Sequence, residues 1–338
     1  MVREGISLFT KGKIVLLMLM MLSLLVSACG SQTAAPATNA TQTPAATDST
    51  TPAAEEARTI THAMGETKIT GTPQRIVVLT NQGTESLLAL GIKPVGAVKS
   101  WIGEPWFDHI KDQMGGVEVV GDETQPNMEL IASLKPDLIL GTKVRQEKIY
   151  SQLLSIAPTV FTENLGDSMI ENFELYAKAV NKEAEGAAVL KAFHKNIDEA
   201  KTKLGDKTKM QVSLARFQPG KVRVYYKNNF AGVILEKIGF ARPEAQNKDE
   251  FTADIAKEQM AVLDGDVFFY FASDREGDDG ATQTVKEWLS DPLAQNMDVT
   301  KKNRTYQVNE AIWNSSGGII AANLMVKDIE KIFADINQ

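Results

Sequence analysis

ELIASLKPDLIL, at residues 129–140, aligns without a gap with EQMAVLDGDVFF at residues 258–269. Glutamate, alanine, leucine and aspartate recur at the same offsets in both stretches. In each case a segment with helical spacing is followed by a short apolar run, which is typical of a helix that leads into a buried strand. The repeat predicts two equivalent α/β lobes, each presenting one glutamate, Glu129 or Glu258, at a corresponding surface position.

Outward from both stretches, short apolar runs alternate with helical patterns. This alternation predicts βαβ units and mainly parallel sheets. Strands are expected at residues 76–79, 95–98, 117–120, 138–140 and 159–161, and again at 211–217, 222–226, 266–272 and 305–308. A helix over residues 318–336 is expected to follow the last strand.

A long helix is predicted between the two halves, over residues 182–204. Its apolar residues recur every three or four positions and form one stripe, consisting of Leu190, Phe193, Ile197, Ala200 and Leu204. Ser168 and Glu171 fit a capping box at the start of the preceding helix. The expected fold is therefore α/β, with an N-terminal lobe over residues 58–181, a linker helix and a C-terminal lobe over residues 205–338.

The first 57 residues indicate a lipoprotein. Residues 1–28 combine a basic start, an apolar run too short to span a bilayer, and small residues before Cys29, the only cysteine. We expect this signal peptide to be removed and Cys29 to carry the lipid. Residues 29–57, rich in Ser, Thr, Ala and Pro, are expected to form a flexible linker. The protein is thus expected at the extracytoplasmic face of the cell membrane, in a cell with one membrane, as in Gram-positive bacteria.

Charge and motifs narrow the function classes. The chain has 36 basic and 43 acidic residues and no long basic stripe, so nucleic acid is not an expected partner. Its three histidines, at positions 62, 109 and 194, are too scattered to predict a zinc or manganese site. It has no nucleophile elbow and no phosphate-binding glycine loop, so an enzyme is not expected. A structural surface lipoprotein remains an alternative.

Aromatic and guanidinium side chains follow several predicted strands. Ligands of open parallel sheets bind beyond the carboxyl ends of the strands, so these side chains are candidate ligand contacts. Arginine supplies donors for carboxylate, hydroxamate or catecholate oxygens, and aromatic rings supply flat apolar faces. The candidates are Trp101, Arg145, Arg216, Tyr225, Phe230, Arg275 and Trp313.

Several sequence motifs, taken in their order along the chain, resemble those of the substrate-binding lipoproteins of bacterial iron–siderophore importers of the ATP-binding-cassette (ABC) type. They cover nearly all of residues 58–338 and include PQRIVV (73–78), ESLLALGIKPVG (85–96), NMELIASLKPDLI (127–139), IAPTV (156–160), VRVYY (222–226), FAGVILEKIGFARP (230–243) and WNSSGG (313–318). The resemblance implies the class III periplasmic-binding-protein fold: two Rossmann-like lobes bridged by one helix, with limited hinge motion. It also implies capture of a ferric complex between the lobes and delivery to a membrane permease driven by an ATPase.

The resemblance also implies roles for single residues. Glu129 and Glu258 occupy the positions at which members of the family meet arginines of the permease. The cleft residues carried over are Trp101, Arg145, Arg216, Tyr225, Phe230 and Trp313.

The expected ligand is a ferric siderophore of hydroxamate or mixed citrate–hydroxamate type. Hydroxamate-binding members often have Trp and Arg beside the glycine that corresponds to Gly232, where this chain has Asn229, Phe230 and Ala231. Citrate carboxylates would suit Arg145 and Arg216. A haem or catecholate-siderophore receptor of the same importer class is the alternative. Iron is expected to arrive already chelated, so no cofactor or metal site is predicted, and the protein is expected to be a monomer.

Overall fold

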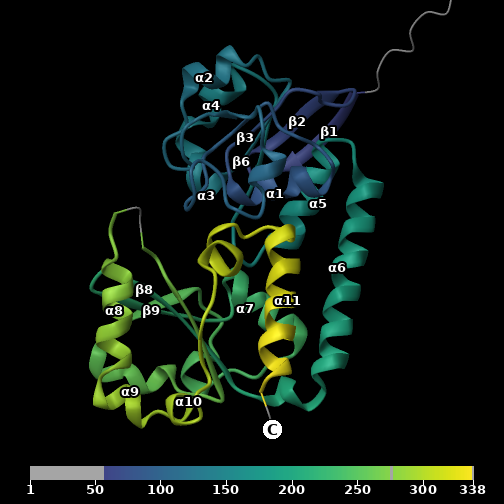
Figure 1. Ribbon diagram of the computed structural model, residues 1–338. Helices are drawn as coiled ribbons and strands as arrows, with labels where there is room; N and C mark the ends of the chain where they lie inside the picture. The colour runs from purple at the N-terminus through teal and green to yellow at the C-terminus, as the bar shows by residue number, and fades with distance from the viewer. Residues whose placement is uncertain (1–56, 275–276, 337–338) are drawn as a thin grey trace, which may run out of the picture. The chain divides into compact units, whose positions relative to one another are not determined.

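The computed structural model describes residues 57–274 and 277–336. The predicted signal peptide, Cys29 and all but the last residue of the predicted linker lie outside these residues, as does Arg275. Within the described part of the chain, no helix has both the length and the apolar character needed to cross a bilayer. The described residues form two α/β lobes and a long helix, α6 (Figure 1).

The N-terminal lobe is built on a five-stranded parallel sheet with strand order β5-β4-β3-β6-β7. The strands are β3 (Ile76–Val78), β4 (Gly96–Ala97), β5 (Glu118–Val119), β6 (Leu138–Thr142) and β7 (Thr159–Thr162). All residues of β3, β6 and β7 are buried, as expected for parallel strands covered on both faces. The helices of this lobe are α1 (Asn81–Ala89), α2 (Met128–Ser133), α3 (Lys143–Gln146), α4 (Tyr150–Leu154) and α5 (Met169–Ala179).

A β-hairpin that the sequence pattern did not reveal precedes this sheet. Strand β1 (Ala57–His62) pairs antiparallel with β2 (Gly65–Thr70). Only Ile60, Thr67 and Ile69 of the hairpin are buried. Because the buried positions are so few, the hairpin lacks the apolar run by which the other strands were predicted.

The C-terminal lobe has a mixed sheet with strand order β10-β9-β8-β11-β12. Its strands are β8 (Val212–Gln218), β9 (Lys221–Tyr225), β10 (Thr252–Ile255), β11 (Val267–Ala272) and β12 (Thr305–Gln307). Strands β8, β11 and β12 run parallel, but β9 runs antiparallel to both of its neighbours. The reversal follows from the two-residue turn Pro219-Gly220, in which Gly220 has a φ of +65°. The helices are α7 (Phe230–Ile238), α8 (Gly280–Leu289), α9 (Pro292–Asn296), α10 (Asp298–Lys301) and α11 (Ile319–Ala334).

Helix α6 (Glu183–Leu204) occupies the position predicted for the long helix. All five residues of the predicted stripe are buried, and the helix lies beside α11 and α5 (Figure 1). The capping-box prediction for α5 is wrong. The helix begins after Ser168, but the Ser168 hydroxyl hydrogen-bonds the neighbouring Asp167 and makes no cap.

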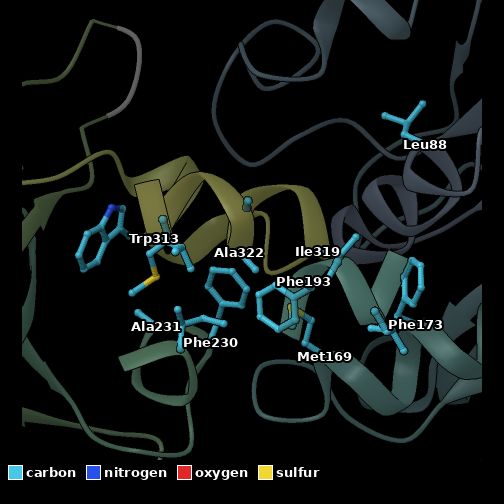
Figure 2. Packing of buried hydrophobic residues seen from close by; sticks show 14 of the residues in the cluster. Leu88, Met169, Phe173, Phe193, Phe230, Ala231, Trp313, Ile319 and Ala322 are labelled. Carbon is cyan, nitrogen blue, oxygen red and sulfur yellow. The ribbon is translucent and has the colours of Figure 1, made fainter. Parts of the chain in front are cut away.

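One apolar core runs through both lobes, which belong to a single compact unit. Figure 2 shows part of it: Met169 and Phe173 of α5, Phe193 of α6, Phe230 and Ala231 of α7, and Ile319 and Ala322 of α11. The lobes are therefore joined by packed side chains as well as by the linker helix. The limited hinge motion that the resemblance implies stays a prediction.

The repeated aspartates of the two predicted helix–strand stretches occupy equivalent places. Asp137 accepts hydrogen bonds from the backbone N–H groups of Gln74 and Arg75, at 2.7 and 2.9 Å, just before β3. Asp266 accepts one from the backbone N–H of Gln211, at 2.8 Å, just before β8. Each aspartate thus ties its own strand to the start of the neighbouring parallel strand, so the sequence repeat reflects a repeat in structure.

Candidate functional site

Trp101 and Arg145 lie together in the N-terminal lobe. Arg145 lies on α3, directly after β6, and its Cζ is 5.9 Å from the centre of the Trp101 ring, within the range of a cation–π contact. Trp101 is 46% exposed. On its other side, Arg145 Nε faces Glu123 Oε2 at 3.7 Å. The N-terminal lobe therefore presents an exposed ring and a half-exposed guanidinium side by side.

Glu123, the acid that faces Arg145, is fixed in place by hydrogen bonds. One carboxylate oxygen accepts hydrogen bonds from the backbone N–H and the side-chain amide of Asn81, at 2.6 and 2.8 Å. Its backbone carbonyl accepts a third from Gln146 Nε2, at 2.7 Å. The side chain is 3% exposed, and burial raises the pKa of Glu123 above its usual value. The buried carboxylate of Glu123 thus lies beside the guanidinium of Arg145.

Arg216, Tyr225 and Glu310 form a second cluster, in the C-terminal lobe. Arg216 Nη2 lies 2.5 Å from Glu310 Oε1, and Arg216 Nε donates a hydrogen bond to Ser273 Oγ. The Arg216 guanidinium also lies close enough to Tyr225 for its charge to act against the rise in the pKa of the phenol. Tyr225 itself is buried, with 2% of its surface exposed, so it can contribute at most its hydroxyl and not a ring face. Burial raises the pKa of this hydroxyl, which therefore stays neutral at physiological pH. Two of the predicted residues are thus brought together here.

Phe251 extends this second cluster and was not predicted. Its ring centre lies 6.1 Å from that of Tyr225, and the side chain is 53% exposed. A Cβ placed on Gly166 of the N-terminal lobe would lie 3.3 Å from the Phe251 ring, so this ring stands where the lobes meet. Each lobe therefore combines an exposed aromatic ring, an arginine and a buried glutamate.

A cavity of about 480 Å³ lies between the lobes. Its lining includes Ile102, Phe107 and His109 from the N-terminal lobe and Asp274, Asn309 and Glu310 from the C-terminal lobe. Glu310, the partner of Arg216, lines the cavity directly, and Ile102 is the chain neighbour of Trp101. The predicted residues Trp101, Arg145, Arg216 and Tyr225 are not themselves lining residues of this cavity. Its size is within the range of small-molecule sites.

Phe230 and Trp313 lie in the core, away from any exposed surface. Trp313 is fully buried, packs on Phe269 with ring centres 4.7 Å apart, and donates from Nε1 to Asp328 Oδ2 at 3.1 Å. Phe230 is buried at the start of α7, and both residues belong to the packed cluster of Figure 2. Burial leaves neither ring a face for a ligand, so we omit both predicted residues from the proposed binding surface.

A family model described as "Periplasmic binding protein" matches residues 76–311. The chain belongs to the periplasmic binding protein family. This match, together with the relatives and the SirA structure described next, confirms the family and the fold class predicted from the sequence motifs.

Several named proteins are similar to this periplasmic binding protein. The "Probable siderophore-binding lipoprotein YfiY" of Bacillus subtilis is 49% identical over 286 residues, with 82% of this chain and 88% of the relative covered. The "Fe(3+)-citrate-binding protein YfmC" of the same organism is 32% identical, with coverages of 82% and 86%. Staphylococcus aureus SirA complexed with staphyloferrin B superposes with a TM-score of 0.77 at 33% identity, covering 82% of this chain and 98% of SirA.

The two repeated glutamates of this periplasmic binding protein are both exposed. Glu129 lies in the first turn of α2, and Glu258 lies in the first turn of the 3₁₀ helix Lys257–Leu263. The first helix precedes β6 and the second precedes β11, as the repeat predicted. Among the described residues, neither carboxylate has an ion-pair partner.

Among the residues of this periplasmic binding protein that the structure describes, no group of three or more His, Cys, Asp or Glu side chains is placed to hold a metal ion. His62 contacts Thr67 at 2.9 Å, and His109 contacts Glu85 at 2.5 Å. His194 stands on α6 beside Phe193. The three histidines thus have separate surroundings.

Sequence reasoning missed Phe251, Glu123 and Glu310 in this periplasmic binding protein. Phe251 reaches Tyr225 only because β10 pairs with the reversed strand β9. The two glutamates look like any other acid in the sequence, because their burial depends on residues far away in the chain. A signal for the reversal was present in the dipeptide Pro219-Gly220, which favours a tight turn.

Proposed function

We propose that this periplasmic binding protein captures a ferric siderophore between its lobes and delivers it to the permease of an ABC importer. The arrangement that carries the proposal is the presence in each lobe of an exposed aromatic ring and an arginine in one cluster, with a cavity between the lobes that Glu310, the partner of Arg216, lines. Guanidinium groups hydrogen-bond the anionic oxygens of a chelate, and the rings cover its carbon frame. Capture requires no bond-making step, so we propose no enzymatic activity.

A chelate with carboxylate oxygens, of citrate or citrate–hydroxamate type, suits this site best. Arg145 and Arg216 offer planar forks of donors that match carboxylate geometry. Relatives named for ferric citrate and ferric dicitrate, 32% and 26% identical to this chain, support the same class. The iron travels as cargo inside its chelator, so the protein needs no cofactor and no metal ligands of its own.

Quenching of tryptophan fluorescence tests the ligand class, because Trp101 stands exposed beside Arg145. The panel comprises ferric staphyloferrin B, ferric citrate, a ferric tris-hydroxamate, a ferric tris-catecholate, haem and the iron-free chelators. We expect saturable quenching by the ferric carboxylate chelates and weak or no quenching by the iron-free forms. Tight binding of haem or of uncomplexed iron, with no response to any ferric chelate, would overturn the proposal.

Glu129 and Glu258 supply the proposed docking contacts with the permease. Both are exposed and occupy matching places in the two lobes, so a permease with paired basic sites would meet one glutamate from each lobe. Replacing either by alanine is expected to leave chelate affinity unchanged and to lower uptake of ⁵⁵Fe-labelled chelate by cells. The matched control is Glu66→Ala, at an exposed position on β2. Loss of chelate affinity in Glu129→Ala or Glu258→Ala would contradict the assignment.

The lipid anchor at Cys29 completes the proposal and accounts for the linker that follows it. Tethering would keep a monomeric receptor near the permease at the outer face of the membrane. Mass spectrometry of the mature N-terminus is expected to show a lipid-modified cysteine. A Cys29→Ser variant that remained in the membrane fraction would contradict the anchor.

A further inference from the structure

Glu123 is placed where ligand binding must alter its surroundings. Its carboxylate is buried, yet it lies 3.7 Å from the nitrogen of a half-exposed arginine, Arg145. Arg216 in the other lobe is held more tightly, at 2.5 Å from Glu310. The longer contact leaves Arg145 the freer of the two arginines, and in the part of the chain that the structure describes Glu123 is the buried acid that faces it.

Among residues 57–274 and 277–336, the other groups around Glu123 do not supply a second positive charge. Asn81 donates to it from α1, and Tyr176 on α5 interacts with it through an un-ionised hydroxyl whose pKa burial raises to about 12. Lys99 acts on the neighbouring Asp122, and Asp122 hydrogen-bonds Thr124. Arg145 is therefore the cation on which the ionised form of Glu123 depends.

We propose that Glu123 is a positioning residue that holds Arg145 against Trp101 in the empty protein and accepts a proton when an anionic ferric chelate takes over Arg145. Two anions cannot share one guanidinium at the edge of a buried site without loss of binding energy. A chelate oxygen at Arg145 therefore favours the neutral carboxyl group. The bound proton stays on Glu123 and leaves when the chelate leaves. The inference rests on the proposed function, because it requires an anionic ligand at Arg145.

The reason to expect proton uptake in an accessible pH range is the burial of the carboxyl group. Burial already raises the pKa of Glu123, and the hydrogen bonds from Asn81 oppose this only in part. A nearby anion raises the pKa of a carboxyl group further. Proton uptake by Glu123 is therefore expected at higher pH than an ordinary glutamate would show.

The decisive experiment compares wild type with Glu123→Gln, in which a neutral amide replaces the carboxyl group and keeps an acceptor for Asn81. The Kd of ferric citrate is measured by tryptophan quenching between about pH 5 and 8, and the ratio of the two Kd values is taken at each pH. The ratio cancels protonation of the chelate itself. Uptake of one proton changes Kd by about tenfold per pH unit. We therefore expect the two proteins to have the same Kd at low pH, and the Kd of wild type to be at least about tenfold higher than that of Glu123→Gln at the top of the range. Glu66→Gln, at an exposed position, is the matched control and should follow wild type throughout.

A difference in Kd that is the same at every pH would overturn the inference, because a merely structural role for Glu123 predicts such a constant offset. Calorimetry of wild type in two buffers of different ionisation enthalpy provides a second test that needs no variant. We expect net proton uptake on binding, beyond that of the chelate, and zero uptake would also overturn the inference. Failure of the proposed function has a different signature, since no ferric chelate in the panel would then bind at any pH.

Discussion

Glu85, on α1 of the N-terminal lobe, accepts a hydrogen bond from the backbone N–H of Ala321 in the first turn of α11, at 2.9 Å. Its other oxygen lies 2.5 Å from His109 Nε2 at the inter-lobe cavity. Three residues earlier on α1, Gln82 Nε2 donates to the carbonyl of Gly317 at 2.9 Å. Two polar side chains of helix α1 thus hydrogen-bond the backbone at the start of α11, and these hydrogen bonds join the lobes next to the cavity.

Gly318 makes room for this contact. A Cβ at this position would lie 2.5 Å from Glu85 Oε2 and 2.6 Å from Glu85 Cβ, although the φ of −106° is open to any residue. Gly318→Ala is therefore expected to displace Glu85 and to lower the free energy of unfolding by about 1–3 kcal/mol, as overpacking does. Urea unfolding measures the change. The matched control is Gly115→Ala, because a Cβ there meets nothing within 4 Å. Equal changes in the free energy of unfolding for the two substitutions would show that the hydrogen bonds between α1 and α11 add no stability.

His62 predicts a loss of stability in mild acid. Its Nδ1 accepts hydrogen bonds from the backbone N–H groups of Phe161 and Met64, at 3.2 and 3.3 Å, so the folded protein favours the neutral ring. Burial lowers the pKa of His62 from its unfolded value of 6.5. The unfolded chain therefore binds the proton more readily than the folded protein does. The contribution of His62 to the free energy of unfolding is fully present above about pH 6.5 and is lost as the pH falls from there through the folded pKa. Urea unfolding of His62→Gln should show a weaker decline with acid, whereas His194→Gln, at an exposed position on α6, should match wild type. An unchanged decline in His62→Gln would assign the acid sensitivity to other groups.

Phe251 is expected to contribute affinity without contributing stability. Because its ring is half exposed beside Tyr225, truncation removes little buried surface from the free protein but removes a face that a bound chelate would cover. Phe251→Ala should weaken chelate binding by about 1–2 kcal/mol, or roughly 5- to 30-fold in Kd, with the midpoint of urea unfolding nearly unchanged. The comparison variant is Leu293→Ala on α9, which is 50% exposed and lines neither cluster. Full affinity in Phe251→Ala would remove this ring from the site.

Local patterns predicted most of the fold, and long-range packing explains what they missed. The stripe of α6 follows from helical spacing alone, and the matching aspartates Asp137 and Asp266 recur because each lobe needs the same strand tie. The positions of Phe230 and Trp313 after strands were visible in the sequence, but their burial depends on α11 and on the core shared by both lobes. The same limit applies to Glu123 and Glu310. A buried acid is recognised by its partners, and these lie on segments that only the fold brings together.

The measurement that tests the central claim most directly is calorimetric titration of ferric citrate into wild type and Arg145→Ala. Arg145 is half exposed, and its contacts are a long one with Glu123 and a cation–π contact with the exposed Trp101, so its truncation should leave the fold intact. We predict saturable binding by wild type and a loss of about 1.5–3 kcal/mol in the variant, the range for a hydrogen bond to a charged group. The same titration of Lys195→Ala, at an exposed position on α6, controls for overall charge. Equal affinity of wild type and Arg145→Ala would contradict the claim that this guanidinium grips the chelate.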